Sequence, residues 1–117
     1  LNSWFHYDLE SVDGNAVKDK AQLHEQSARI LSILDEERER LPEKDGRRMV
    51  LWGLSQGAGL AVHVALRASF SLGAVIALRG MALAEDDNTL LPWQQHHADQ
   101  RLLEVFASNG GRDRMCP

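Results

Sequence analysis

The stretch "VLWGLSQGAGLAVHVAL", residues 50–66, decides the fold of this 117-residue chain. It begins with a short apolar run typical of a strand and ends in an alanine-rich run, small and apolar enough for a helix that packs directly on a sheet. Between the two runs lie Gly-Leu-Ser-Gln-Gly, residues 53–57, which match the pattern G-x-S-x-G. A strand, a tight turn and a helix in immediate succession favour a chain of the α/β class.

The turn places Ser55 where it can act as a nucleophile. The chain must reverse sharply from strand to helix, and glycine at Gly53 and Gly57 removes the Cβ atoms that would block such a turn. The turn exposes the Ser55 hydroxyl, and it directs the backbone N–H of Gln56, at the start of the helix, towards a developing oxyanion. Ser55 is therefore the candidate nucleophile and Gln56 the candidate oxyanion-hole donor.

Apolar spacing predicts the remaining elements. The run over 72–78, "LGAVIAL", is rich in β-forming residues without alternation, which is typical of a strand buried on both faces. A helical stripe is formed by Leu23, Ile30, Leu31 and Leu34, extended by Val17 and Ala28. The predicted elements are helices over 16–41, 56–68 and 93–100, and strands over 49–52, 72–78 and 102–107.

Strands that alternate with helices imply a parallel sheet with helices on its faces. We therefore expect one α/β domain over residues 1–117, with a parallel sheet of about three strands flanked by helices. The chain begins at Leu1 rather than Met and ends in the turn-like "GGRDRMCP", so we expect an incomplete domain cut from a longer sequence. Such a piece should have low stability or associate with itself, because parallel strands need cover on both faces.

Composition excludes several classes of protein. Hydrophobic residues make up 44% of the chain and charged residues 26%, as in soluble globular proteins. A net charge of −4 gives no reason to expect nucleic acid as a partner, and the apolar runs are too short to span a membrane. The single cysteine, Cys116, cannot form an internal disulfide and fits a reducing compartment, so we expect a cytoplasmic protein.

Four stretches match one known pattern in order and spacing, at residues 3–5, 52–66, 72–83 and 109–117. Together they resemble the acyl-protein thioesterase family, the phospholipase/carboxylesterase branch of the α/β-hydrolases. "WGLSQGAGLAVHVAL", residues 52–66, resembles that family's serine turn, which reads close to G-G-F-S-Q-G-G-A-L-A. "SWF" (3–5) resembles its S/A-W-F-D, "LGAVIALRGMAL" (72–83) resembles its strand "LAGVIALSGFLP", and "NGGRDRMCP" (109–117) resembles "HGxxDxVVP". The resemblance covers nearly the whole chain.

The resemblance implies a partial α/β-hydrolase fold and a serine hydrolase of carboxylic esters and thioesters. By it, Ser55 forms an acyl-enzyme, Asp113 is the acid that orients a histidine, and the Gln56 backbone N–H is one oxyanion-hole donor. It also implies acylated proteins or lipid esters as substrates and neither a metal nor an organic cofactor. The family's catalytic histidine segment, and the early strands with the second oxyanion donor, are expected to be missing from this chain.

The sequence departs from the family pattern at four positions. Asn109 and His6 replace a histidine and an aspartate, which are tolerable polar changes. Trp52 replaces a glycine just before the serine turn, and we expect its side chain to crowd that turn. Arg79 replaces a small serine after the second strand.

Four of the histidines are candidates for the missing base or for metal ligands. His96 and His97 follow the second strand, and ligands and catalytic groups collect at the carboxyl edge of such sheets. The order Ser–His–Asp would be irregular for this fold, however, and "QQHH" suits a polar loop equally well. We expect His24 on a helix surface and His63 at the helix–sheet boundary. An isolated His-His pair is a weak metal motif, so no metal site is expected.

Two other functions stay open. One is a catalytically inert remnant that binds acyl chains or a protein partner, for which an uncovered sheet edge would favour self-association. The other is an esterase of a neighbouring α/β-hydrolase branch that acts on short-chain or carbohydrate esters. Candidates for lining an acyl-chain groove, or equally for ordinary core positions, are Met81, Leu83, Leu90, Leu91 and Trp93.

Overall fold

The computed structural model describes residues 3–6, 17–80, 83 and 104–108 of the chain. In chain order these contain α1 (Lys20–Glu39), the short 3-10 helices η1 (Pro42–Lys44) and η2 (Gly46–Arg48), β1 (Val50–Leu54), α2 (Gln56–Ala65), β2 (Ala74–Leu78) and β3 (Glu104–Ser108). Neither α-helix of this described part is long and apolar enough to cross a membrane. The helix predicted over 93–100 lies outside the described residues.

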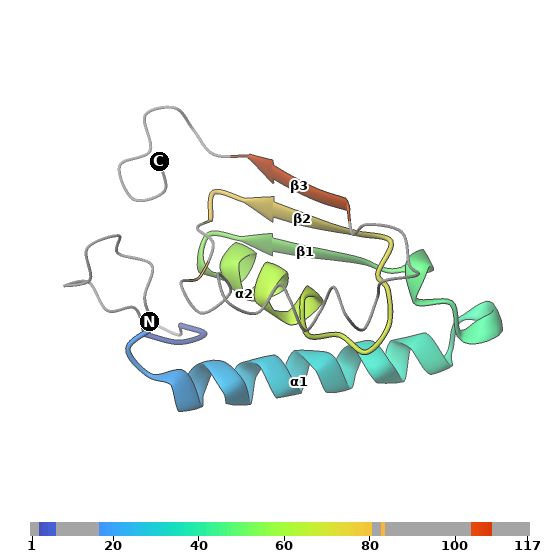
Figure 1. Ribbon diagram of the computed structural model, residues 1–117, viewed down its shortest axis with the longest axis horizontal. Helices are drawn as coiled ribbons and strands as arrows, with labels where there is room; N and C mark the ends of the chain where they lie inside the picture. The colour runs from blue at the N-terminus through green and yellow to red at the C-terminus, as the bar shows by residue number, and fades with distance from the viewer. Residues whose placement is uncertain (1–2, 7–16, 81–82, 84–103, 109–117) are drawn as a thin grey trace.

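The strands form one parallel sheet in the order β1-β2-β3, and their arrows point the same way in Figure 1. The register aligns the last residues of all three, since Leu54 pairs with Leu78 and Leu78 with Ser108. The predicted α/β class with three parallel strands is therefore confirmed. Each strand begins one or two residues later than expected. For β1 the reason is that Met49 still closes the preceding turn, donating its N–H to the Gly46 carbonyl oxygen at 2.9 Å.

Helix α1 begins later than predicted because the residues before it are held by another segment. Lys18 donates its backbone N–H to the His6 carbonyl oxygen at 2.7 Å. Asp19 then caps the helix, its carboxylate accepting the Gln22 N–H at 3.0 Å, so that the helix starts at Lys20 rather than at residue 16. The predicted apolar residues Leu23, Ile30, Leu31 and Leu34 pack on the core. Val17 also belongs to the core although it precedes the helix, whereas Ala28 is exposed and does not extend the stripe.

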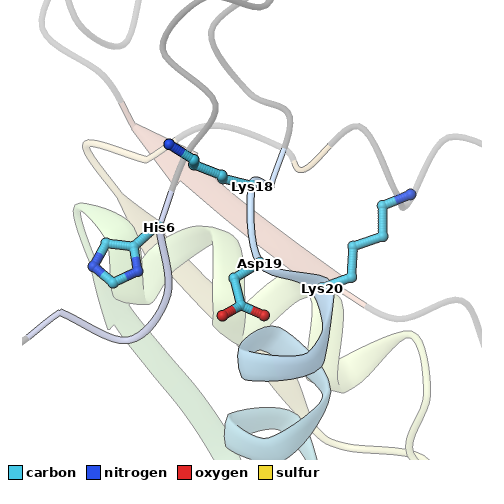
Figure 2. Close-up of a pocket in the computed structure, with 4 residues that line it drawn as sticks. All are labelled: His6, Lys18, Asp19 and Lys20. Carbon is cyan, nitrogen blue, oxygen red and sulfur yellow. The ribbon is translucent and has the colours of Figure 1, made fainter.

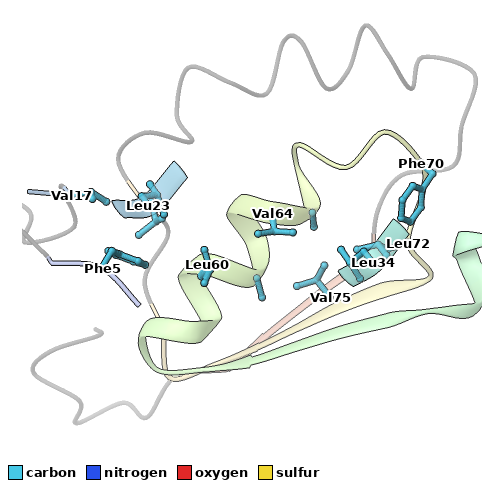
Figure 3. Packing of buried hydrophobic residues seen from close by; sticks show 12 residues of the cluster. Phe5, Val17, Leu23, Leu34, Leu60, Val64, Phe70, Leu72 and Val75 are labelled. Atoms are coloured by element: carbon cyan, nitrogen blue, oxygen red, sulfur yellow. The ribbon is translucent and has the colours of Figure 1, made fainter. Parts of the chain in front are cut away.

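The hydrophobic core lies between the two helices and one face of the sheet. Helix α2 packs on β1 and β2, and α1 packs against α2 (Figure 1). Figure 3 shows Leu60 and Val64 of α2 beside Val75 of β2, with Phe5 entering from the N-terminal segment. The largest fully buried side chains are Phe5, Leu23, Leu83, His63, Val64 and Val75. Burying an aliphatic side chain of this size contributes roughly 1.5–3 kcal/mol, so this cluster is the main source of stability.

The opposite face of the sheet is open. On β1, the alternate residues Val50, Trp52 and Leu54 are 56%, 65% and 56% exposed, and Phe106 of β3 is 58% exposed. On β2, the residues of that face are only half-buried. The prediction of a strand buried on both faces is therefore wrong, because within the described residues α2 covers one face alone. Trp52 lies on the open face, away from α2, and does not crowd the serine turn.

Replacing Leu34 with alanine should destabilise the chain far more than replacing its neighbour Ile33. Leu34 belongs to the core cluster and is 8% exposed, whereas Ile33 on the same helix is 46% exposed. Losing a buried leucine side chain costs about 2–5 kcal/mol, and an exposed substitution about 0.5 kcal/mol or less. Urea unfolding followed by circular dichroism measures both losses. Equal losses for Leu34→Ala and Ile33→Ala would contradict the packing of α1.

Candidate active site

Strand β1 ends in a turn that puts Ser55 at the head of α2. The Ser55 backbone has φ 54° and ψ −123°, a conformation that is costly for a residue with a side chain. Two hydrogen bonds hold it there. Ser55 donates its N–H to the Leu78 carbonyl oxygen at the end of β2 over 2.8 Å, and the Ser55 carbonyl oxygen accepts the Ala58 N–H at 3.0 Å. Ser55 is thus fixed and exposed at the carboxyl edge of the sheet.

The two glycines of the motif differ in whether the structure has room for a side chain at their positions. A Cβ on Gly53 would overlap the Gly57 carbonyl oxygen, so only glycine lets β1 and α2 approach this closely. At Gly57 a Cβ would find its nearest neighbour, Trp4 Nε1, at 3.5 Å, which is an ordinary contact. The steric demand of the turn therefore rests on Gly53.

A third glycine, which the sequence analysis missed, closes the turn from the other side. A Cβ on Gly80 would overlap the Ala58 side chain and lie 2.8 Å from the Ser55 carbonyl oxygen. Residues after β2 thus pass directly against the first turn of α2. One feature of the sequence could have pointed to Gly80: it lies two residues after the strand predicted over 72–78, at the edge of the sheet where Ser55 was expected.

Gln56 contributes through both its backbone and its side chain. Its backbone N–H lies at the first position of α2 and donates to no other described residue, so it is available to an oxyanion. Its side chain accepts the Trp4 backbone N–H at 2.7 Å and donates to the Phe5 carbonyl oxygen at 2.5 Å. These two bonds fasten segment 3–6 to the start of α2. The motifs "SWF" and Ser-Gln-Gly do not by themselves predict this role of the Gln56 side chain.

Arg79 lies at the same edge as Ser55. It follows β2 directly, has φ 54°, and donates its backbone N–H to the Ser108 carbonyl oxygen at the end of β3 over 2.7 Å. Because Ser55 is bonded to Leu78 in the same way, the ends of the three strands form one continuous edge. The Arg79 side chain is exposed. In open α/β sheets this edge is where ligands bind.

An open pocket of about 750 Å³ lies at the start of α1, lined by His6, Lys18, Asp19 and Lys20 (Figure 2). The start of α1 and the carboxyl ends of the strands lie at the same end of the molecule (Figure 1). His6 directly follows Phe5, whose carbonyl is bonded to Gln56, so the pocket adjoins the segment that Gln56 fastens. No pattern in the sequence predicts this pocket.

The structure brings four of the predicted site residues into one turn: Gly53, Ser55, Gln56 and Gly57. The predicted acid Asp113 and the candidate bases His96 and His97 lie outside the described residues, as does Cys116. Of the groove candidates, Leu83 is a core residue and the others also lie outside. The roles of Ser55 as nucleophile and Asp113 as acid stay predictions.

Two further histidines of the described part lie on the α-helices, away from the segment that precedes α1. His24 is exposed on α1, and His63 is 1% exposed within α2, both as expected. No three His, Cys, Asp or Glu side chains among the described residues are grouped to hold a metal ion. Hydrogen bonds from Arg47 lower the pKa of the Asp45 carboxyl, which lies before β1 at the opposite end of the sheet.

Comparison with known proteins agrees with this geometry. The family model described as phospholipase/carboxylesterase matches residues 2–117, nearly the whole chain. Two solved structures are similar, the crystal structures of SOBER1 from Arabidopsis thaliana and of a substituted form of it. In each case the TM-score is 0.58 and the sequence identity 20%, over 92% of this chain and 64% of the solved one. The likeness shows the α/β-hydrolase fold, and this chain spans 64% of their length. No curated protein matches the chain.

Alanine at Gly53 should disrupt the turn, whereas alanine at Gly57 should be tolerated. The Cβ at Gly53 overlaps the Gly57 carbonyl and requires β1 and α2 to separate, which we expect to cost about 1–3 kcal/mol or more. At Gly57 the helix propensity of alanine changes stability by about 1 kcal/mol at most. Thermal unfolding of Gly53→Ala and Gly57→Ala gives the comparison. A Gly53→Ala chain as stable as the parent would refute the close approach of β1 and α2.

Proposed function

The chain belongs to the phospholipase/carboxylesterase family, and on this premise we propose that it hydrolyses carboxylic esters and thioesters through an acyl-enzyme on Ser55. One observation carries the proposal: an exposed serine is held at positive φ between a strand and a helix, beside the backbone N–H of Gln56, which donates to none of the described residues. This arrangement supports acyl transfer because a hydroxyl and an oxyanion donor can then meet one carbonyl group.

The proposed reaction has two stages. Ser55 Oγ attacks the acyl carbonyl carbon while its proton passes to a base, and the carbonyl oxygen becomes an oxyanion that the Gln56 N–H stabilises. The leaving alcohol or thiol takes that proton, and water then releases the acyl group from Ser55 as a carboxylic acid. In this proposal Asp113 orients a histidine that acts as the base. His96 and His97 are the candidates that this chain offers.

The proposed substrates are acyl esters and thioesters carried by proteins or lipids, and the proposed location is the cytoplasm. Support comes from "WGLSQGAGLAVHVAL" and "LGAVIALRGMAL", the stretches that resemble acyl-protein thioesterases. The alternative is an ester with a short acyl chain, as in a neighbouring α/β-hydrolase branch. Comparing acyl chains of increasing length in one assay separates the two.

The open sheet face favours a second candidate, association of two copies of the chain. Val50, Trp52 and Leu54 each expose more than half of their surface along β1. Exposed apolar patches of this kind mark association sites, and parallel sheets ordinarily bury both faces. A second copy presents the same row of side chains, so two copies can cover each other. Self-association is compatible with catalysis, because the face lies away from α2 and Ser55.

Replacing Ser55 with alanine should abolish covalent labelling by a fluorophosphonate and lower ester hydrolysis by on the order of 10³-fold or more. The reason is that the probe bonds only to an activated hydroxyl. Intact mass spectrometry detects the adduct, and Ser32→Ala on the exposed side of α1 is the control. A folded parent chain that takes up no label, or a Ser55→Ala chain that still does, would refute the proposal.

Replacing Trp52 with serine should weaken self-association by about tenfold or more, because a large aromatic side chain leaves the shared face. Sedimentation velocity at a series of concentrations measures the monomer–dimer equilibrium. Ile33→Ser, which removes an exposed apolar side chain from α1, is the matched control and should change little. A parent chain that stays monomeric at every concentration would show that the face remains open in solution.

A further inference from the structure

Arg79 is enclosed on both sides by residues that contact Ser55. The residue before it, Leu78, accepts the Ser55 N–H at 2.8 Å. The residue after it, Gly80, runs so close to the turn that a Cβ there would lie 2.8 Å from the Ser55 carbonyl oxygen. A substrate whose carbonyl reaches Ser55 therefore passes within one side-chain length of Arg79.

The backbone fixes Arg79 at this edge, and within the described residues its side chain forms no ion pair. Its backbone has φ 54°, a conformation that suits glycine better than any residue with a side chain. The side chain is exposed, and no described carboxylate pairs with its guanidinium. In the resembling family motif this position is a small serine, so the cation distinguishes this chain from the pattern.

The described charges around this edge are mostly positive, although the chain as a whole carries −4. Among its described lining residues, the pocket at the start of α1 adds the cations Lys18 and Lys20, and the carboxylate of Asp19 is engaged as the helix cap. The pocket is connected to the turn by the bonds from Gln56 to segment 3–6. The end of β2 and the start of α1 thus bring cations to the same end of the molecule as the head of α2 (Figure 1).

We propose that Arg79 is a specificity-determining residue that favours esters carrying a carboxylate or phosphate close to the bond that is cleaved. A guanidinium presents paired N–H donors that match the oxygens of either group. This inference rests on the proposed function, because it assumes that Ser55 is where the ester is attacked. It specifies the charge of the preferred substrate, which the proposed function does not define.

Two matched pairs of esters test the inference. The first pair places the charge on the acyl side: the mono-4-nitrophenyl ester of glutaric acid against 4-nitrophenyl valerate. The second places it on the alcohol side: 1-butyrylglycerol 3-phosphate against 1-butyrylglycerol. The quantity measured is the ratio of kcat/KM for the charged ester to kcat/KM for the neutral one. The pair that responds identifies which side of the ester carries the anion.

The parent chain should prefer the charged ester of at least one pair, and Arg79→Ser should reduce that ratio by roughly five- to tenfold. Arg79→Lys should keep most of the preference, and added salt should weaken it. Arg79→Gly is the second variant, since it removes the charge while relieving the backbone at φ 54°. Arg48→Ser, which removes an exposed arginine before β1 at the opposite edge, is the matched control and should leave both ratios unchanged.

Failure of this inference can be told from failure of the proposed function. Hydrolysis that needs Ser55 but shows the same ratios with and without Arg79 overturns the role of Arg79 alone. If no hydrolysis depends on Ser55, titration with the 4-nitroanilides of glutaric and valeric acid gives the same comparison by binding. Tighter binding of the charged anilide that is lost in Arg79→Gly supports the anion site without the reaction. Equal binding overturns it.

Discussion

The rest of the structure depends on the close approach of β1 to the first turn of α2. Gly53 lies so near the Gly57 carbonyl that any side chain there would overlap it. Because of this approach the chain reverses within one residue, and Ser55 takes the positive φ that the reversal demands. The same approach sets α2 directly on the sheet, where Val64 meets Val75 in the core (Figure 3). One steric contact therefore governs both the packing of the sheet and the exposure of the serine.

Patterns that depend on near neighbours along the chain were sufficient to predict the α-helices and strands of the described residues and the turn. The spacing of Leu23 and Leu34 predicts the buried stripe of α1, and Gly53 before Ser55 marks a reversal that a residue with a side chain does not allow. The start of α1 escaped prediction because a bond to His6, from a distant part of the chain, competes with the helix. Burial on both faces was predicted wrongly for a similar reason: a strand's own residues do not reveal what covers them.

In the candidate site too, the local sequence predicts some residues, whereas others depend on contacts between distant segments. Ser55 and the Gln56 backbone N–H follow from the local turn, so sequence reasoning reached them. The Gln56 side chain bonds Trp4, 52 residues away, and no rule of spacing reports such a contact. Gly80 is constrained by the first turn of α2 rather than by its own neighbours, so its importance is visible only once the two segments lie together.

The two polar groups beside Ser55 act on different stages of a reaction. The Gln56 N–H meets the carbonyl oxygen at hydrogen-bond distance, so its contribution grows as negative charge develops there and appears in kcat. Arg79 is exposed, and its field is screened within about 8–10 Å at physiological ionic strength. A permanent anion on the substrate feels that field equally before and during the reaction, so the contribution of Arg79 appears in KM. Gln56 therefore lowers the barrier for whatever ester is bound, and Arg79 influences which ester binds.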